Sequence, residues 1–247
     1  MAGLNRPGPG ARARMLLRSF AVQGSWNYQT LIGTGLAFVL APALKEVYGG
    51  DREALRQALG RHAELFNSHP YLASVAAGAV ARLEADGVPA ETVARFKAAV
   101  RGSLGTLGDR LVWLLWRPMC VLLGLALVMA GAAWWVGALA FLLVFNALHL
   151  WMRVWGLRVG LRDGLQIGRT LKAVPFARLG ERAAQAGALL AGFAAAMAGT
   201  ARGARPWEWG LALLAALLGI ALGPRVRGAA ALVMVLALVA GLVLART

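Results

Sequence analysis

An uncharged run covers residues 119–152 and reads MCVLLGLALVMAGAAWWVGALAFLLVFNALHLWM. A single straight helix over these 34 residues would be about 51 Å long, at about 1.5 Å per residue. The hydrocarbon core of a bilayer is only about 30 Å thick, so one helix would have to tilt strongly. Two helices folded near Gly131 would each be shorter than a comfortable span. Both arrangements place this run in a membrane; the residues alone leave the choice open, and we prefer the pair.

The composition also indicates a membrane protein. Of 247 residues, 59% are hydrophobic and 15% charged, and the mean hydropathy is +0.63, which excludes an ordinary soluble domain. The formal charge of +15 would suit nucleic-acid binding. However, the basic residues often lie at the edges of apolar runs, as in the cytoplasmic loops of membrane proteins. We therefore expect a lipid bilayer as partner, and no nucleic acid. The single cysteine, Cys120, allows no intrachain disulfide and no cysteine-based metal cluster.

The first half of the chain alternates short apolar pieces with polar breaks. Residues 1–14 are rich in Gly, Pro and Arg, which predicts a disordered basic start on the cytoplasmic side and no cleaved signal peptide. Residues 15–29 begin amphipathically and suit the membrane interface. The uncharged residues 30–44 are too few for a simple crossing and contain Pro42, which predicts a broken or re-entrant helix.

Two charged helices are expected after these pieces. The first covers residues 45–70, with Asp51 as N-cap and Pro70 at its end, because the residue before a proline avoids the helical region. The second covers residues 82–101 and is interrupted just before Pro89, which lies near a helix start.

Glycines recur in the sequence GSLGTLGD, residues 102–109. Glycines three apart that are followed by an aspartate suggest a phosphate-binding loop, but the Gly-Lys-Ser/Thr that such a loop requires is missing. We expect a tight loop or a helix break inside the membrane domain.

The second half is predicted to contain longer helices. Residues 153–182 carry an excess of Arg and Lys, which places them in the cytoplasm by the positive-inside rule. Small residues recur there every four positions and predict a seam where another backbone approaches closely. They are Gly156, Gly160, Gly164 and Gly168. Three apolar runs then predict transmembrane helices at 183–201, 207–223 and 229–245.

The fold expected is therefore an all-α integral membrane protein. It is a polytopic helical bundle, with amphipathic and broken or re-entrant helices over 15–118 and apolar helices over 119–152. A basic cytoplasmic segment follows over 153–182, and three C-terminal transmembrane helices complete the chain over 183–247.

A polar stretch, residues 61–71, reads RHAELFNSHPY. Unpaired polar groups in hydrocarbon cost several kcal/mol each, so these side chains must meet water, a substrate or another protein group. The three histidines of the chain are too scattered for a metal site, and no nucleophile elbow supports a hydrolytic triad. Two interpretations stay equal on the residues alone. One is a site for sugar hydroxyls, covered by aromatic side chains such as Trp26, Tyr28 and Phe66, and the other is a buried polar network that ties helices together.

Short motifs recur in a characteristic order along residues 16–170. They are Arg18-Ser19-Phe20, Gln23 to Tyr28, Pro42-Ala43-Leu44, Tyr48, Arg61-His62, Phe66 to Pro70, Lys97, Gly102, Leu104-Gly105, Gly108-Asp109, Trp113, Arg117-Pro118, Phe145-Asn146 and Gly156 to Gly160. In this order and spacing they resemble the IID component of the mannose/fructose/sorbose family of the sugar phosphotransferase system (PTS).

The resemblance implies a subunit that assembles with a IIC membrane subunit into a permease of the bacterial cytoplasmic (inner) membrane, typically as a trimer of IIC–IID pairs. Cytoplasmic IIAB proteins phosphorylate the sugar, a mannose-type hexose, during uptake, so no catalytic residue and no cofactor or metal is expected in this chain. We expect Asn67 and Glu64 to bind sugar hydroxyls. The full set expected at the polar site or the gate beside it is Gln23, Trp26, Asn27, Glu64, Asn67, His69 and Asp109.

The chain departs from the family pattern in two places. Relatives commonly have a proline where this chain has Ser103, and many carry a longer extracytoplasmic segment where this chain has only residues 202–206. The sugar preference therefore does not carry over from the resemblance. An alternative is a divergent paralogue that assembles in the membrane and regulates without transporting.

Overall fold

The computed structural model describes residues 7–201, 203, 205–207 and 210. The chain divides into two compact units, Met1–Ala194 and Ala195–Thr247, and every contact between elements described below lies within the first. The crossings predicted at 207–223 and 229–245 lie outside the described residues, apart from positions 207 and 210.

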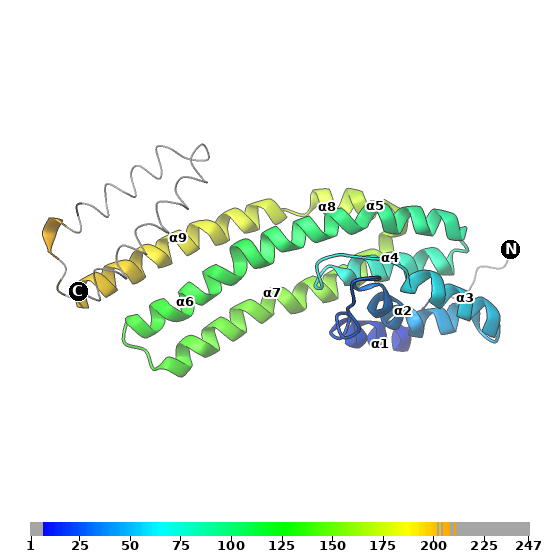
Figure 1. Ribbon diagram of the computed structural model, residues 1–247, viewed down its shortest axis with the longest axis horizontal. Coiled ribbons are helices and arrows are strands. Elements are labelled where there is room, and N and C mark those ends of the chain that lie inside the picture. Colours follow the sequence, from blue (N-terminus) through cyan, green and yellow to red (C-terminus); the bar gives the residue numbers. More distant parts are fainter. Residues whose placement is uncertain (1–6, 202, 204, 208–209, 211–247) are drawn as a thin grey trace. The chain divides into compact units, whose positions relative to one another are not determined.

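Helices make up most of the first unit and are joined by short turns and by two longer irregular segments, residues 20–32 and 64–72 (Figure 1). In chain order the helices are α1 (Pro9–Ser19), α2 (Gly33–Tyr48), α3 (Arg52–Ala63), α4 (Ala73–Ala85), α5 (Ala90–Gly108), a π-helix (Asp109–Trp116), α6 (Arg117–Met129), α7 (Trp134–Asp163), a 3-10 turn (Gly164–Gln166), α8 (Ile167–Ala173) and α9 (Phe176–Ala201), of which α9 continues into the second unit. The prediction of an all-α protein is confirmed for this part of the chain.

The N-terminal helices differ from the prediction at their ends. Because α1 begins at Pro9, the expectation of disorder over 1–14 is wrong for residues 9–14. Asp51 is the N-cap of α3 as predicted, and its side chain accepts a hydrogen bond from the Ala54 amide at 2.9 Å. Pro70 does not end this helix, since α3 stops at Ala63 and an irregular segment follows.

The uncharged run folds as a pair of helices, as preferred. α6 ends at Met129 and α7 begins at Trp134, and Gly131 supplies the left-handed conformation (φ +97°) that the turn requires. The expectation that each arm is too short is wrong, because both helices continue past the run. By length and composition, Ala90–Met129 and Trp134–Ala201 are long and apolar enough to cross a membrane.

Segment 102–109 is helical, so the predicted loop or break is wrong. The helix continues as a π-helix from Asp109. Gly108 permits close packing here rather than a turn. A Cβ at Gly108 would lie 2.2 Å from the Cβ of His69, far inside contact distance.

The predicted glycine seam holds for two of its four members. A Cβ at Gly156 would lie 2.5 Å from Ser74 Oγ, and a Cβ at Gly160 would lie 2.3 Å from the Val75 carbonyl oxygen, so α7 packs directly on α4 there. Gly164 instead ends α7 with φ +53°, and a Cβ at Gly168 would have no atom of the described residues within 4 Å. Through this packing α4, which is buried along almost its whole length, becomes the centre of the N-terminal bundle.

Candidate functional site

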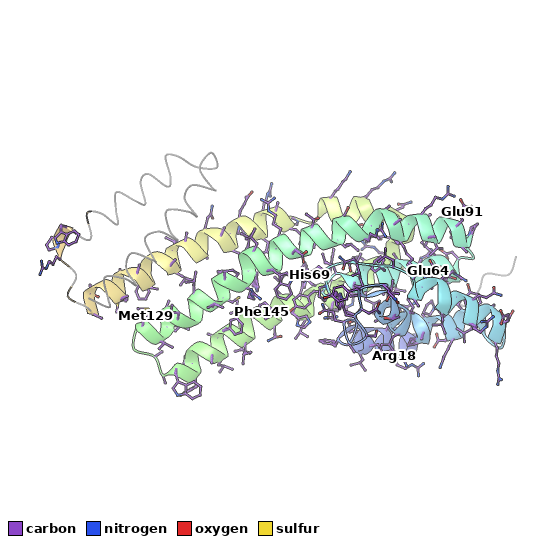
Figure 2. All side chains as sticks on the ribbon, viewed as in Figure 1. Arg18, Glu64, His69, Glu91, Met129 and Phe145 are labelled. Atoms are coloured by element: carbon purple, nitrogen blue, oxygen red, sulfur yellow. The ribbon has the colours of Figure 1, made fainter. Side chains whose placement is uncertain are left out.

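Two irregular segments, residues 20–32 and 64–72, pair with each other through their backbones. The Ile32 amide donates to the Phe66 carbonyl at 3.0 Å, and the Phe66 amide donates to the Thr30 carbonyl at 3.2 Å. Leu31 lies between these bonds with φ +54°, a strained conformation for a residue with a branched side chain. The pairing brings the predicted site residues of both segments into one region, which includes Glu64 and His69 in Figure 2.

Asn67 and Asp109 line the same pocket, which has a volume of about 380 Å³. Both side chains are exposed, and the strained Leu31 forms part of the wall. The pocket also contains Arg101 and Thr106. An amide, a carboxylate, a guanidinium and a hydroxyl together can donate to and accept from the hydroxyls of a sugar.

Asn27 holds the first segment in its turn. Its side-chain oxygen accepts from the amides of Gln29 (2.9 Å) and Thr30 (2.8 Å), and its amide nitrogen donates to the Thr30 hydroxyl at 2.8 Å. This is the local bonding by which asparagine stabilises turns. Trp26 is half-exposed with its ring edge against Tyr28, and Gln23 is exposed.

His69 is buried rather than open to the pocket. Its ring packs against Tyr71 (centroids 4.8 Å apart), Trp113 (5.2 Å) and Gly108, and its Nδ1 accepts from the Tyr71 amide at 3.2 Å. Within the described part of the chain, its Nε2 has no hydrogen-bond partner. Burial lowers the pKa of His69 to about 4, so the ring is neutral at physiological pH. His69 therefore fixes the segment before α4 against the start of the π-helix.

Glu64 lines a different pocket from Asn67. That pocket has a volume of about 240 Å³ and includes Arg61, His62 and Lys97 among its other lining residues. The sequence predicts Glu64 and Asn67 at the end of one helix, residues 45–70. Since α3 ends at Ala63, the two side chains instead face separate spaces.

A buried carboxylate that the sequence analysis did not single out, Glu84, joins three helices. Its oxygens accept hydrogen bonds from Arg61 (2.6 and 3.2 Å), from His62 Nε2 (2.8 Å) and from the Tyr48 hydroxyl. Burial raises the pKa of Glu84, but these hydrogen bonds outweigh burial and lower it to about 2. Burial also lowers the pKa of His62, against the opposing effect of Glu84. Lys97 of α5 joins this cluster by donating to the Arg61 carbonyl at 2.6 Å.

Arg153 is a second buried charge that the sequence analysis did not single out, on the apolar helix α7. Its guanidinium donates to the Ser19 carbonyl at the end of α1, to the Ser19 hydroxyl at 3.2 Å and to His149 Nε2 at 2.6 Å. His149 in turn stacks on Tyr71 with ring centroids 3.9 Å apart. Arg153 therefore caps the C-terminus of α1, where backbone carbonyls lack helical partners, and fixes where residues 20–32 begin.

Metal-binding residue types are not gathered in this region. Among the described residues, no group of three or more His, Cys, Asp or Glu side chains is arranged to hold a metal ion. The polar groups that the pairing brings together are instead the amide, carboxylate, guanidinium and hydroxyl side chains described above.

Comparison with known families agrees with the order of motifs. A family model described as the PTS system mannose/fructose/sorbose family IID component matches residues 10–198. The chain belongs to this family. Among IID relatives, the mannose-specific component of Escherichia coli K12 is 33% identical over 158 residues, which is 62% of this chain and 55% of the relative. The fructose permease IID component of Bacillus subtilis is 30% identical over 183 residues, 72% of this chain and 66% of the relative.

Two solved membrane-protein structures are also similar to this chain. The mannose transporter ManYZ, determined in complex with microcin E492, matches with a TM-score of 0.61 and 29% identity over 75% of this chain and 69% of the solved chain. A second solved membrane protein matches with a TM-score of 0.67 and 29% identity, over 76% and 70% of the two chains. The chain spans little more than half the length of the E. coli relative, so substrate and partners do not transfer with family membership.

Proposed function

We propose that this chain is the IID membrane subunit of a mannose-family sugar phosphotransferase permease. With a IIC subunit it forms the translocation path for a hexose, which cytoplasmic IIAB proteins phosphorylate during uptake. The observation that carries the proposal is the IID family match over residues 10–198, and similarity to a mannose transporter supports it. The chain supplies binding groups and geometry, and phosphoryl transfer occurs on the partners.

The sugar-contacting groups of this proposal lie at the 380 Å³ pocket. Asn67 and Asp109 offer an amide and a carboxylate to sugar hydroxyls, and Trp26 and Gln23 act from the exposed part of the paired segment. The three other predicted residues have different roles in this proposal. Asn27 shapes the turn, His69 fixes the segment before α4, and Glu64 belongs to a gate at the separate 240 Å³ pocket.

The proposed topology is multi-pass in a bacterial inner membrane, with assembly as a trimer of IIC–IID pairs. The paired helices α6 and α7 and the helix α9 cross the bilayer, and the re-entrant pieces lie in the first half. Residues 153–182 face the cytoplasm. The connection between α7 and α9 contains Arg169 and Lys172, and the other basic residues of the segment lie on the adjoining parts of these two helices, which supports a shared side for the segment.

Uptake in whole cells tests the proposal. The chain is produced with its own IIC and IIAB partners, and accumulation of radiolabelled hexoses is measured for the wild type, Asn67→Ala and Asp109→Asn. We expect both variants to lose at least tenfold in uptake while the IIC complex forms normally. Gln57→Ala, an exposed amide on α3 outside the pocket, is the matched control and should transport normally.

Two results would contradict parts of this proposal. Normal uptake by both Asn67→Ala and Asp109→Asn would overturn the site while leaving the subunit role intact. No uptake of any hexose by a well-formed wild-type complex would overturn the transport role and favour a regulatory paralogue.

A further inference from the structure

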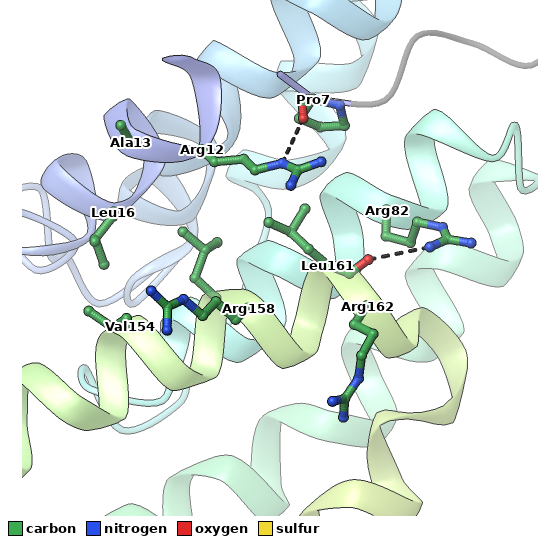
Figure 3. A pocket seen from close by; sticks show the side chains of 10 residues that line it. Pro7, Arg12, Ala13, Leu16, Arg82, Val154, Arg158, Leu161 and Arg162 are labelled. Atoms are coloured by element: carbon green, nitrogen blue, oxygen red, sulfur yellow. Dashed lines mark hydrogen bonds between the residues drawn. The ribbon is translucent and has the colours of Figure 1, made fainter. Parts of the chain in front are cut away.

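A pocket that the proposed sugar path does not use opens between α1, α4 and α7 (Figure 3). Its volume is about 490 Å³. Four arginines line it, namely Arg12 from α1, Arg82 from α4, and Arg158 and Arg162 from α7. Among the described residues that line it, none is acidic. Guanidinium groups bind phosphate with paired, charge-assisted hydrogen bonds, so this set favours an anionic occupant with phosphate chemistry.

Two of these four charges have no carboxylate partner. Arg82 is paired with Asp86 at 2.5 Å, and Arg162 with Asp163 at 2.5 Å. Arg12 donates from its Nε only to the neutral Pro7 carbonyl at 2.7 Å (Figure 3). Arg158 is exposed, and the described part of the chain offers it no hydrogen bond or ion pair. The pocket therefore has a net positive charge of two that its own surroundings leave uncompensated.

The rest of the pocket wall is largely apolar. Leu16 of α1 and Val154, Leu157 and Leu161 of α7 lie among the arginines. A small soluble anion would gain nothing from these side chains. A ligand with a phosphate and a hydrocarbon chain would satisfy both parts of the wall.

The neighbouring residues place the pocket at the depth of lipid headgroups. Trp151 and Trp155 stack on each other along α7, and tryptophans gather at membrane–water interfaces. Arg158 follows Trp151 by about 10 Å along the helix, at about 1.5 Å per residue. Leu17 on α1 is 70% exposed and Phe20, just after its end, is 48% exposed, as in a helix that lies in the interface.

We propose that this pocket binds the phosphate of an anionic phospholipid, with Arg158 and Arg12 as principal contacts and an acyl chain along the apolar wall. A soluble phosphate ester shares the headgroup chemistry, but the apolar wall and the position beside the aromatic residues favour the lipid. The site would join α1 to α7 from the membrane side, independently of whether the chain transports sugar.

Lipid binding to the purified chain tests this site. The protein is delipidated in neutral detergent, and binding of phosphatidylglycerol, cardiolipin and phosphatidylcholine is measured by native mass spectrometry. Inorganic phosphate and glycerol 3-phosphate are added as competitors. The combined variant Arg12→Gln, Arg158→Gln removes both proposed contacts and is compared with Arg169→Gln, Arg178→Gln, which removes equal charge at exposed positions outside the pocket.

The expected result is binding of the two anionic lipids over phosphatidylcholine by at least tenfold. Binding should be lost in the 12/158 variant and kept in the 169/178 variant, with no competition from either soluble phosphate at millimolar concentration. Arg158→Lys, which keeps the charge, should bind at an intermediate level and excludes misfolding as the cause. Equal binding by both glutamine variants would overturn the site. Displacement of the bound lipid by glycerol 3-phosphate would contradict the lipid assignment and indicate that the pocket binds a soluble phosphate ester.

Discussion

Replacing Gly160 by alanine tests the contact between α7 and the buried helix α4. The added Cβ would lie 2.3 Å from the Val75 carbonyl oxygen, 2.7 Å from the Ala79 nitrogen and 3.0 Å from the Gly78 carbonyl carbon. All three atoms belong to the backbone of α4, so no side chain can rotate away. Ordinary contact begins near 3.4 Å, and the helices would have to separate by about 1 Å.

Two opposing contributions set the change in the free energy of unfolding of Gly160→Ala. Alanine is favoured over glycine inside a helix by about 1 kcal/mol. Overpacking a well-filled contact costs about 1–3 kcal/mol. Gly192→Ala in α9 should gain helix propensity without a clash, because no atom of the described residues lies within 4 Å of a Cβ placed at Gly192. The difference in the free energy of unfolding between the two variants therefore measures the clash alone. We expect about 1–3 kcal/mol, which corresponds to roughly 2–12 °C in Tm for a chain of this size.

The assay is thermal unfolding in detergent, followed by the fluorescence of the nine tryptophans. We expect Gly160→Ala to unfold several degrees below Gly192→Ala, and Gly192→Ala to unfold at or slightly above the wild type. A Tm for Gly160→Ala equal to or above that of Gly192→Ala would refute the close approach of α4 and α7.

Three further predictions use the same unfolding assay. Asp51→Ala removes the N-cap of α3 and should lower the free energy of unfolding by about 1 kcal/mol. Asp51→Ser keeps a capping side chain and should lower it much less. An equal loss of stability in both variants would contradict the cap. Glu84→Gln removes the buried negative charge that Arg61 pairs with and should lower the free energy of unfolding by about 3 kcal/mol. Asp86→Asn removes a carboxylate from an exposed ion pair and should lower it by under about 1 kcal/mol. His69 stays neutral in the fold to about pH 4 but takes up a proton near pH 6.5 when unfolded. The unfolded state thus binds more protons between these values, stability falls as the pH drops from about 6.5 to about 4, and a slope unchanged in His69→Gln would count against this cause.

Local signals in the sequence predicted several elements correctly. The cap at Asp51, the helix start after Pro89 and the turn near Gly131 each depend on residues within a few positions of one another. The close approach at Gly156 and Gly160 was also predictable, because small residues spaced four apart lie on one helix face.

The predictions that were wrong concern contacts between segments far apart in the chain. α3 ends at Ala63 because residues 64–66 pair with residues 30–32. No local sequence pattern predicts this pairing. Gly108 indicated a loop, although it serves the packing of His69 from another segment. Glu84 lies among alanines in an apolar helix, and its partners come from two other helices. Glu64 and Asn67 line separate pockets, and Asn67 shares its pocket with Asp109.

The most direct test of the central proposal is phosphoenolpyruvate-dependent phosphorylation of hexoses in proteoliposomes. The liposomes contain the cognate IIC subunit with or without this chain, and the general phosphocarrier proteins and IIAB are supplied on the cytoplasmic side. We predict turnover of at least one hexose only when this chain is present. Turnover by IIC alone, or none by a fully assembled pair across a panel of hexoses, would contradict its role as the IID subunit of a sugar permease.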